Sequence, residues 1–156
     1  MRIAVLQERA AGEGRVAATP ETVKKFIALG ASVAVERGAG EGASILDAAY
    51  EEAGAELGLA QDVVKGAGIV LAVRAPAAEA LKGAAPGARV AAMFDPFNER
   101  QCVADYAAAG IEALAMEFMP RITRAQSMDV LSSQSNLAGY KAVLAAANEY
   151  GRAFPM

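Results

Sequence analysis

RIAVLQERAAGEGRVAATPETVKKFIALGASVAVE, residues 2–36, begins and ends with a short apolar run. The two runs, RIAVL and SVAVE, are rich in Val, Ile and Ala at successive positions, which is typical of strands buried on both faces. Between them Thr19 and Pro20 supply an N-cap and a first-turn proline for an amphipathic helix, and Gly30 ends it. A strand, a helix and a second strand in this order predict the start of a parallel sheet covered by helices.

The alternation of strands and helices continues to about residue 120. Apolar runs predict further strands at 68–73, 89–94 and 111–116. The segments between them predict helices at 45–54, 60–67, 76–83 and 98–110. The pattern therefore predicts an α/β fold of the Rossmann or flavodoxin-like kind, in which a doubly wound, mainly parallel sheet has helices on both faces.

A long alanine-rich segment follows the last predicted strand. It predicts a helix with Leu137, Tyr140, Leu144 and Ala147 on one face. A helix of this length after a completed sheet is typical of a connector. We therefore expect an N-terminal α/β subdomain at 1–131 and a connector helix at 132–156, which leads to an absent nucleotide-binding subdomain.

Composition excludes several classes of function. The chain has 15 basic and 18 acidic residues and no basic run, so a nucleic-acid partner is disfavoured. One cysteine, Cys102, and no histidine exclude an internal disulfide framework, a multi-cysteine zinc site and Ser-His or Cys-His catalysis. The longest apolar runs are far shorter than the ~20 residues that span a bilayer. We expect a soluble, cytoplasmic protein without a metal site.

A glycine-rich stretch after the second strand raises the possibility of a nucleotide site. GAGEGA at 38–43 fits the pattern G-x-G-x-x-G/A, which places a pyrophosphate against backbone amides. Glu56 lies roughly 20 positions after the first glycine, where that pattern has a ribose partner. The alternative is a tight turn whose glycines adopt positive φ before Ser44 caps a helix. The stretch alone leaves both interpretations open.

The loop after the first strand, at 7–21, carries several charged residues. Loops at the carboxyl ends of strands are where α/β sheets place their ligands, so Arg15 is a candidate to bind an anion. The alternative is that Arg15 and its neighbours Glu8, Arg9 and Glu13 are solvated surface charges.

A second polar stretch, EFMPRITRAQSMDVLSSQSN at 117–136, lies between the last strand and the long helix. It is dense in side chains that donate and accept hydrogen bonds, which a simple connection does not need. One interpretation is a binding loop. The other is an elaborate helix N-cap, in which Asp129 or a serine caps the helix and the arginines face water.

Two segments resemble a known superfamily. Residues 1–40, MRIAVLQERAAGEGRVAATPETVKKFIALGASVAVERGAG, resemble the opening of the alanine dehydrogenase and nicotinamide nucleotide transhydrogenase superfamily. Residues 120–143, PRITRAQSMDVLSSQSNLAGYKAV, are similar to its transhydrogenase branch. Together the similarity runs over essentially the whole chain.

The resemblance implies the N-terminal part of the α subunit, or NAD(H)-binding component, of a proton-translocating, Si-specific NAD(P) transhydrogenase. In that family hydride passes between NAD(H) on this component and NADP(H) on a partner component, while a membrane component moves protons. The NAD(H) component is a homodimer, peripheral on the cytoplasmic face of the inner membrane. Its pyrophosphate loop lies in the second subdomain, beyond Met156 of this chain. The resemblance thus implies that 38–43 is a structural turn and that this chain alone is inactive.

The resemblance also implies the site residues. Arg121, Gln126 and Asp129 match the family's functional arginine, glutamine and aspartate, and Ser132 matches a further nicotinamide contact. Arg121 can pair with Asp129 or reach a cofactor oxygen through its planar fork. Gln126 can donate to and accept from ribose or amide groups, and Ser132 can bond the carboxamide.

Alanine dehydrogenases of the superfamily differ at the keto-acid site. They place a lysine after the third strand and a histidine after the fourth, where this chain has Arg74 and Asp95. Because an arginine does not readily titrate and no histidine is present, an alanine dehydrogenase-like activity is disfavoured. Arg15 matches the superfamily in position, with a structural or a substrate role open. A further alternative is a non-catalytic fragment or docking domain that does not itself bind nucleotide.

Overall fold

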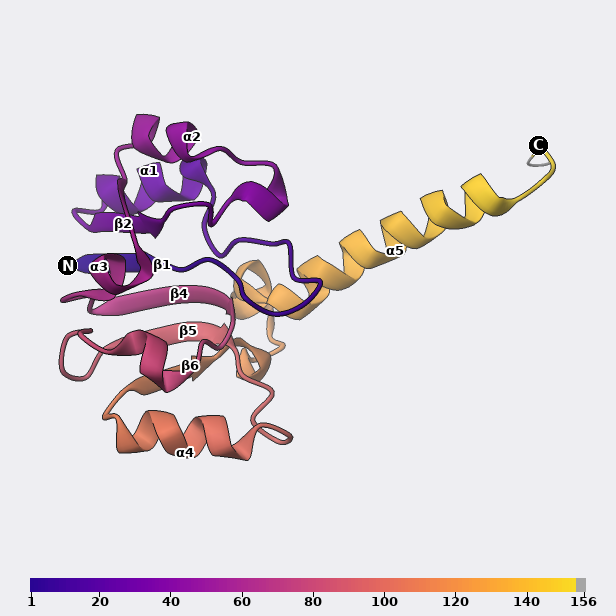
Figure 1. Cartoon of the computed structure of the whole chain (residues 1–156). Coiled ribbons are helices and arrows are strands. Elements are labelled where there is room, and N and C mark those ends of the chain that lie inside the picture. The colour runs from indigo at the N-terminus through magenta and orange to yellow at the C-terminus, as the bar shows by residue number, and fades with distance from the viewer. Residues whose placement is uncertain (154–156) are drawn as a thin grey trace. The chain divides into compact units, whose positions relative to one another are not determined.

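The computed structural model describes residues 1–153 and divides the chain into two compact units, Met1–Ala115 (unit 1) and Met116–Met156 (unit 2) (Figure 1). The predicted end of the connector, 154–156, lies outside the described residues. The boundary predicted near residue 131 stays a prediction.

Unit 1 contains a six-stranded sheet in the order β3-β2-β1-β4-β5-β6. All neighbouring strands pair in parallel. The order reverses between β1 and β4, so the predicted doubly wound α/β fold is confirmed. The strands are β1 Arg2–Val5, β2 Ser32–Glu36, β3 Glu56–Gly58, β4 Ile69–Arg74, β5 Arg89–Met93 and β6 Glu112–Ala115.

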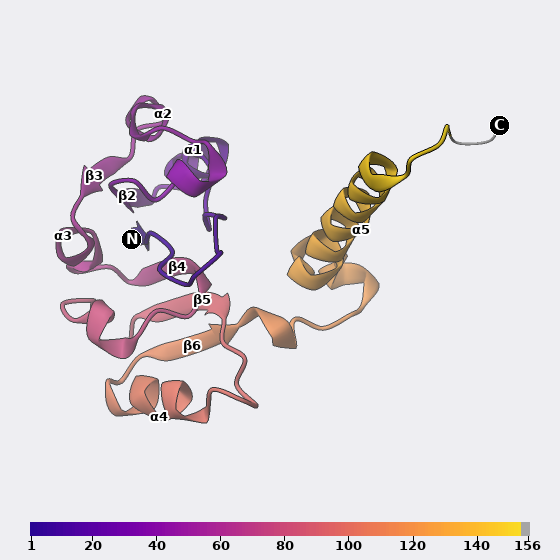
Figure 2. The same ribbon diagram turned by 45° about the vertical axis from the view of Figure 1, so that its right-hand side comes forward.

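Helices cover both faces of this sheet. Figure 2 shows α1 and α2 beside β2, and α4 beside β6. Alternate residues of β1 belong to different apolar clusters: Ile3 and Val5 pack with Val23 of α1, while Ala4 packs with Val63 of α3. This alternation explains why the strands are apolar at successive positions. The helices are α1 Pro20–Ala28, α2 Asp47–Glu52, α3 Ala60–Val64 and α4 Arg100–Ala108, with short 3₁₀ turns at Glu41–Ala43 (η1) and Ala78–Leu81 (η2).

The limits of α1 follow from the residues that flank it. Thr19 Oγ1 accepts a hydrogen bond from Thr22 N at 3.3 Å, and Pro20 occupies the first turn. Gly30 follows the helix at φ +85°, a conformation that glycine adopts without a steric penalty. The predicted cap, first turn and end of this helix are confirmed.

Two sequence-based predictions in unit 1 were wrong. The sequence predicted two successive helices at 45–54 and 60–67, but the strand β3 lies between them. It is a three-residue edge strand containing glutamate and glycine, which strands disfavour, so it leaves little pattern to detect. The helix predicted at 76–83 is the single 3₁₀ turn η2, with Leu81 buried.

Unit 2 consists of the 3₁₀ turns η3 Met116–Phe118 and η4 Thr123–Met128, followed by the 20-residue helix α5 Val130–Glu149. A long helix was predicted here, and it is present. No residue of α5 is buried in the described part of the chain, and Leu137, Tyr140 and Leu144 are exposed. No helix within residues 1–153 combines the length and apolarity that crossing a bilayer requires.

Candidate functional site

The polar loop before α5, residues 121–132, is organised around Asp129. The Asp129 carboxylate accepts hydrogen bonds from Ser132 N at 3.0 Å and from the Ser132 hydroxyl at 2.5 Å. It therefore caps the first turn of α5. The bond from the Ser132 hydroxyl, then that from Ser132 N and the charge of Arg121, lower the pKa of Asp129 below its ordinary value. Asp129 is thus an ionised, fixed anchor of the loop.

Arg121 lies beside this anchor but is not locked to it. Its Nε is 3.9 Å from Asp129 Oδ2, longer than a hydrogen bond of about 3.2 Å. The Arg121 side chain is 72% exposed, whereas that of Asp129 is only 12% exposed. The carboxylate therefore orients the guanidinium by charge and leaves its donors available to a ligand.

Gln126 lies on η4, next to the buried Ala125 that anchors this turn. The backbone carbonyl of Gln126 accepts from Asp129 N at 3.3 Å. Its side chain is exposed and forms no hydrogen bond with residues 1–153. The amide is therefore presented for contacts made from outside the loop. The structure thus groups Arg121, Asp129 and Ser132 and leaves Gln126 separate.

The cap at Asp129 makes the stability of α5 depend on pH. Because the folded-state pKa of Asp129 is below the ordinary value of 3.8, the ionised cap stabilises the helix above that pH. This contribution is lost as the pH falls through the folded-state pKa. We expect Asp129→Asn, which still caps but does not titrate, to lose less helix in acid, measured by far-UV circular dichroism. Equal acid-induced losses in both proteins would contradict this.

The glycine-rich turn at 38–43 is filled by the protein itself. A Cβ on Gly40 would lie 2.6 Å from Ile45 O and 2.8 Å from Tyr50 Cε2, and one on Gly42 would lie 2.8 Å from Gly14 O. These glycines are needed because the chain packs closely on itself, without any reference to a ligand. The geometry supports the structural turn over the nucleotide loop.

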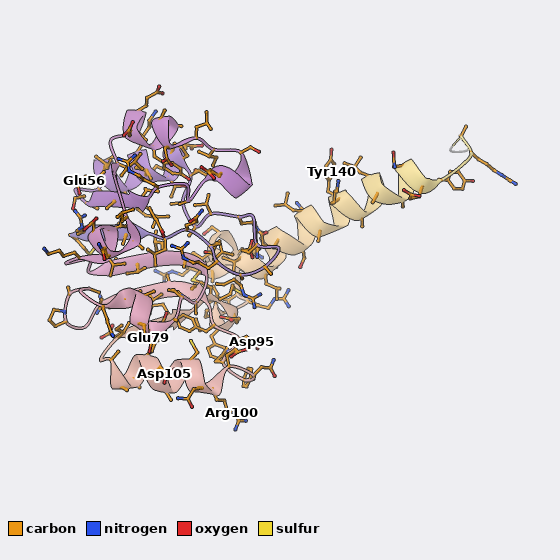
Figure 3. The ribbon with its side chains drawn as sticks, in the orientation of Figure 1. Glu56, Glu79, Asp95, Arg100, Asp105 and Tyr140 are labelled. Atoms are coloured by element: carbon orange, nitrogen blue, oxygen red, sulfur yellow. The ribbon has the colours of Figure 1, made fainter. Side chains whose placement is uncertain are left out.

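Two details of the glycine-rich interpretations are corrected by the structure. Ser44 does not cap α2: it has φ +59° and ends η1, and the residue before α2 is Leu46, which provides no side-chain cap. Glu56 begins β3 and pairs with Arg2 at 2.7 Å, on the side of the sheet where the strands begin (Figure 3). Ligands of α/β sheets bind at the opposite, carboxyl edge, so Glu56 is not placed as a ribose partner.

The carboxyl edge of unit 1 carries contacts that the sequence did not reveal. The Glu8 carboxylate accepts from Val73 N at 2.5 Å and from Arg74 N at 3.1 Å, at the end of β4. Glu36 ends β2 and is the one buried charged residue within 1–153, at 6% exposed. It accepts from Gln7 N at 2.9 Å. The one available signal was a glutamate at the end of the otherwise apolar run SVAVE.

The positions related to the keto-acid site of alanine dehydrogenases are engaged within the chain. Arg15 donates to both Glu13 oxygens, from Nε at 2.7 Å and from a terminal nitrogen at 2.6 Å, and this pairing lowers the pKa of Glu13. Asp95, labelled in Figure 3, has φ +47° and accepts from Asn98 Nδ2 at 2.9 Å. The geometry favours a structural role for Arg15.

Comparison with known proteins identifies related sequences and structures. The chain is 48% identical over 162 residues to a protein of Rhodospirillum rubrum that is the first of the separate parts of an NAD(P) transhydrogenase subunit alpha. This match covers 100% of the chain and 42% of that protein. The chain is 40% identical to NAD(P) transhydrogenase subunit alpha of Haemophilus influenzae, over 99% of the chain and 30% of the relative. It thus spans less than half the length of these relatives.

Solved structures give the same result. The structure of transhydrogenase from Sinorhizobium meliloti matches with a TM-score of 0.93 and 51% identity, covering 100% of this chain and 47% of that one. An L-alanine dehydrogenase matches with a TM-score of 0.72 and 24% identity, over 81% of this chain and 35% of that one, which indicates the shared fold alone.

The resemblance drawn from residues 1–40 and 120–143 is confirmed by these matches. In addition, the family model described as Alanine dehydrogenase/PNT, N-terminal domain, matches residues 4–138. This match covers most of the chain, and the protein therefore belongs to the alanine dehydrogenase/PNT N-terminal domain family.

Proposed function

We propose that this chain acts as the N-terminal part of the NAD(H)-binding component of a proton-translocating NAD(P) transhydrogenase. The observation that carries the proposal is the polar loop, in which Asp129 is fixed by Ser132 while Arg121 and Gln126 remain exposed. The similarity of the whole chain to transhydrogenase α subunits supports it.

Direct hydride transfer between two nicotinamides needs no proton donor or acceptor from the protein. It needs the two rings held close together with water excluded, so the protein contributes positioning and electrostatics. A chain without histidine can meet that requirement. Arg121 keeps its charge at ordinary pH, and Gln126 has none. The loop therefore keeps the same set of donors and acceptors across the physiological pH range.

The residues of the loop fit the nicotinamide end of NAD(H). Arg121 is placed to reach a cofactor oxygen, and Gln126 can both donate and accept. The Ser132 hydroxyl donates its proton to Asp129, so only its lone pairs remain. We infer that Ser132 accepts from the carboxamide NH₂ group and that Asp129 is a positioning residue.

The pyrophosphate end of the cofactor requires other residues. In unit 1 the glycine-rich turn is packed against Gly14, Ile45 and Tyr50, which leaves no cradle for a phosphate there. We propose that contacts with the adenosine and pyrophosphate come from a second subdomain of the complete component.

The proposed partners follow from the names of the relatives. A subunit alpha belongs to an assembly with other subunits. We propose an NADP(H)-binding component and a membrane component that translocates protons, with the NAD(H) component a homodimer on the cytoplasmic face of the membrane. The exposed apolar side chains of α5 are suited to contacts outside unit 2.

Membranes from the native cells provide the test. We expect disruption of the gene for this chain to abolish hydride transfer from NADPH to an NAD analogue, and the wild-type gene to restore it. Unchanged transfer in the disrupted strain would contradict the proposal. Oxidation of NADH with pyruvate and ammonia by the purified protein would instead favour the alanine dehydrogenase-like alternative.

The second candidate function is a docking domain that binds no nucleotide by itself. The filled glycine-rich turn favours it for the isolated chain. We expect the 156-residue chain to bind NADH weakly or not at all in calorimetric titration. Micromolar affinity would contradict both this expectation and the placement of the main nucleotide contacts elsewhere.

A further inference from the structure

Residues Gln7–Arg9, which we name the strap, follow β1 at the point where the strand order of unit 1 reverses. β1 pairs with β2 on one side and with β4 on the other. In open α/β sheets the crevice beside such a reversal, at the carboxyl ends of the strands, is where ligands bind. What occupies this crevice therefore decides whether unit 1 has a ligand site of its own.

The strap is tied to the strands on both sides of β1. Towards β4, the two Glu8 oxygens accept from the successive amides of Val73, at 2.5 Å, and Arg74, at 3.1 Å. Towards β2, Gln7 N donates to Glu36 Oε2 at 2.9 Å, and the Arg9 guanidinium pairs with the other Glu36 oxygen. The strap thus crosses the ends of three neighbouring strands.

The contact of Glu8 has the chemistry of a bound anion. Adjacent backbone amides that point at one carboxylate form the kind of charge-assisted pair that holds phosphates and carboxylates in binding sites. Here the anion belongs to the protein. A tethered group competes at an effective concentration that is commonly millimolar or higher, so a free anion does not readily displace it.

We propose that Glu8 is a built-in anion that occupies the ligand crevice of unit 1 and excludes external phosphate and carboxylate groups from it. The strap then serves as a permanent plug at a place where related folds bind nucleotides or acids. This inference does not depend on the proposed hydride transfer, because it concerns only residues of unit 1.

Nuclear magnetic resonance with inorganic phosphate tests the proposal on the 156-residue chain. We expect no saturable phosphate-induced shift of the Val73 and Arg74 amide signals in the wild-type protein. In Glu8→Ala the two amides lose their partner, and we expect saturable shifts with a dissociation constant of about 1–10 mM. Glu21→Ala is the matched control: it removes an exposed carboxylate that pairs with Lys25, and it should behave like the wild type.

Two results would overturn the proposal. Saturable binding to these amides in the wild-type protein would mean that the crevice is open, and no binding in Glu8→Ala would mean that the amides form no anion site. If Glu8→Ala does not fold, Glu8→Gln takes its place, because the glutamine is nearly the same size and lacks the charge. The Val73 and Arg74 amides should then respond to phosphate in Glu8→Gln, and a lack of response would equally refute the proposal.

Discussion

Replacing Gln126 by alanine is expected to lower the rate of hydride transfer in native membranes by about 10- to 100-fold, because small losses of positioning have large effects on such a step. The Gln126 side chain is exposed and forms no hydrogen bond within residues 1–153, so its truncation should leave the fold intact. Its neutral amide can bridge groups of opposite hydrogen-bonding character on a cofactor. The loss should therefore appear mainly in kcat.

The matched control for this prediction is Gln61→Ala. Gln61 is an exposed glutamine on α3 of unit 1, so the same chemical change is made away from the polar loop. We expect hydride transfer at the wild-type rate in this variant. Equal rates for Gln126→Ala and Gln61→Ala would remove Gln126 from the proposed site, while the family assignment would stand.

The second large effect is expected for Gly40→Ala. A Cβ at this position would lie 2.6 Å from the backbone oxygen of Ile45 and 2.9 Å from Ile45 Cβ. Neither the backbone nor the buried Tyr50 ring beside it can move away freely. We expect the free energy of unfolding of unit 1 to fall by about 3 kcal/mol, the upper part of the range for overpacked sites, measured by urea denaturation.

Gly68→Ala provides the control for the glycine-rich turn. The nearest atom to a Cβ on Gly68 is Met1 Cγ at 3.7 Å, an ordinary contact, and its φ is not positive. This substitution should change the free energy of unfolding by less than about 1 kcal/mol. A loss in Gly40→Ala no larger than in Gly68→Ala would show that the turn is not tightly packed, and would reopen the question of a ligand there.

Most of the sheet could be predicted because its strands are buried on both faces. Their residues are largely apolar at successive positions, and Thr19, Pro20 and Gly30 mark the limits of α1 within a few residues of sequence. The strand β3 could not be predicted, because an edge strand of three residues has little apolar pattern and is defined by its pairing with β2.

The candidate site divides in the same way. The contact between Asp129 and Ser132 spans three residues and follows the local pattern of a helix cap, so the sequence could indicate it. The contact between Glu8 and Val73 spans 65 residues and depends on the strand order. Nothing in the loop at 7–21 distinguishes Glu8 from a solvated charge. Only the tertiary structure reveals its partner.

The central position of β1 has a consequence for the synthesis of this protein. β1 emerges first from the ribosome, yet it lies between β2 and β4 and is complete only when both have paired with it. A nascent chain that ends before Arg74 therefore exposes an apolar strand with an unpaired edge. Such edges are prone to aggregation, so unit 1 depends on protection by chaperones until β4 has been made.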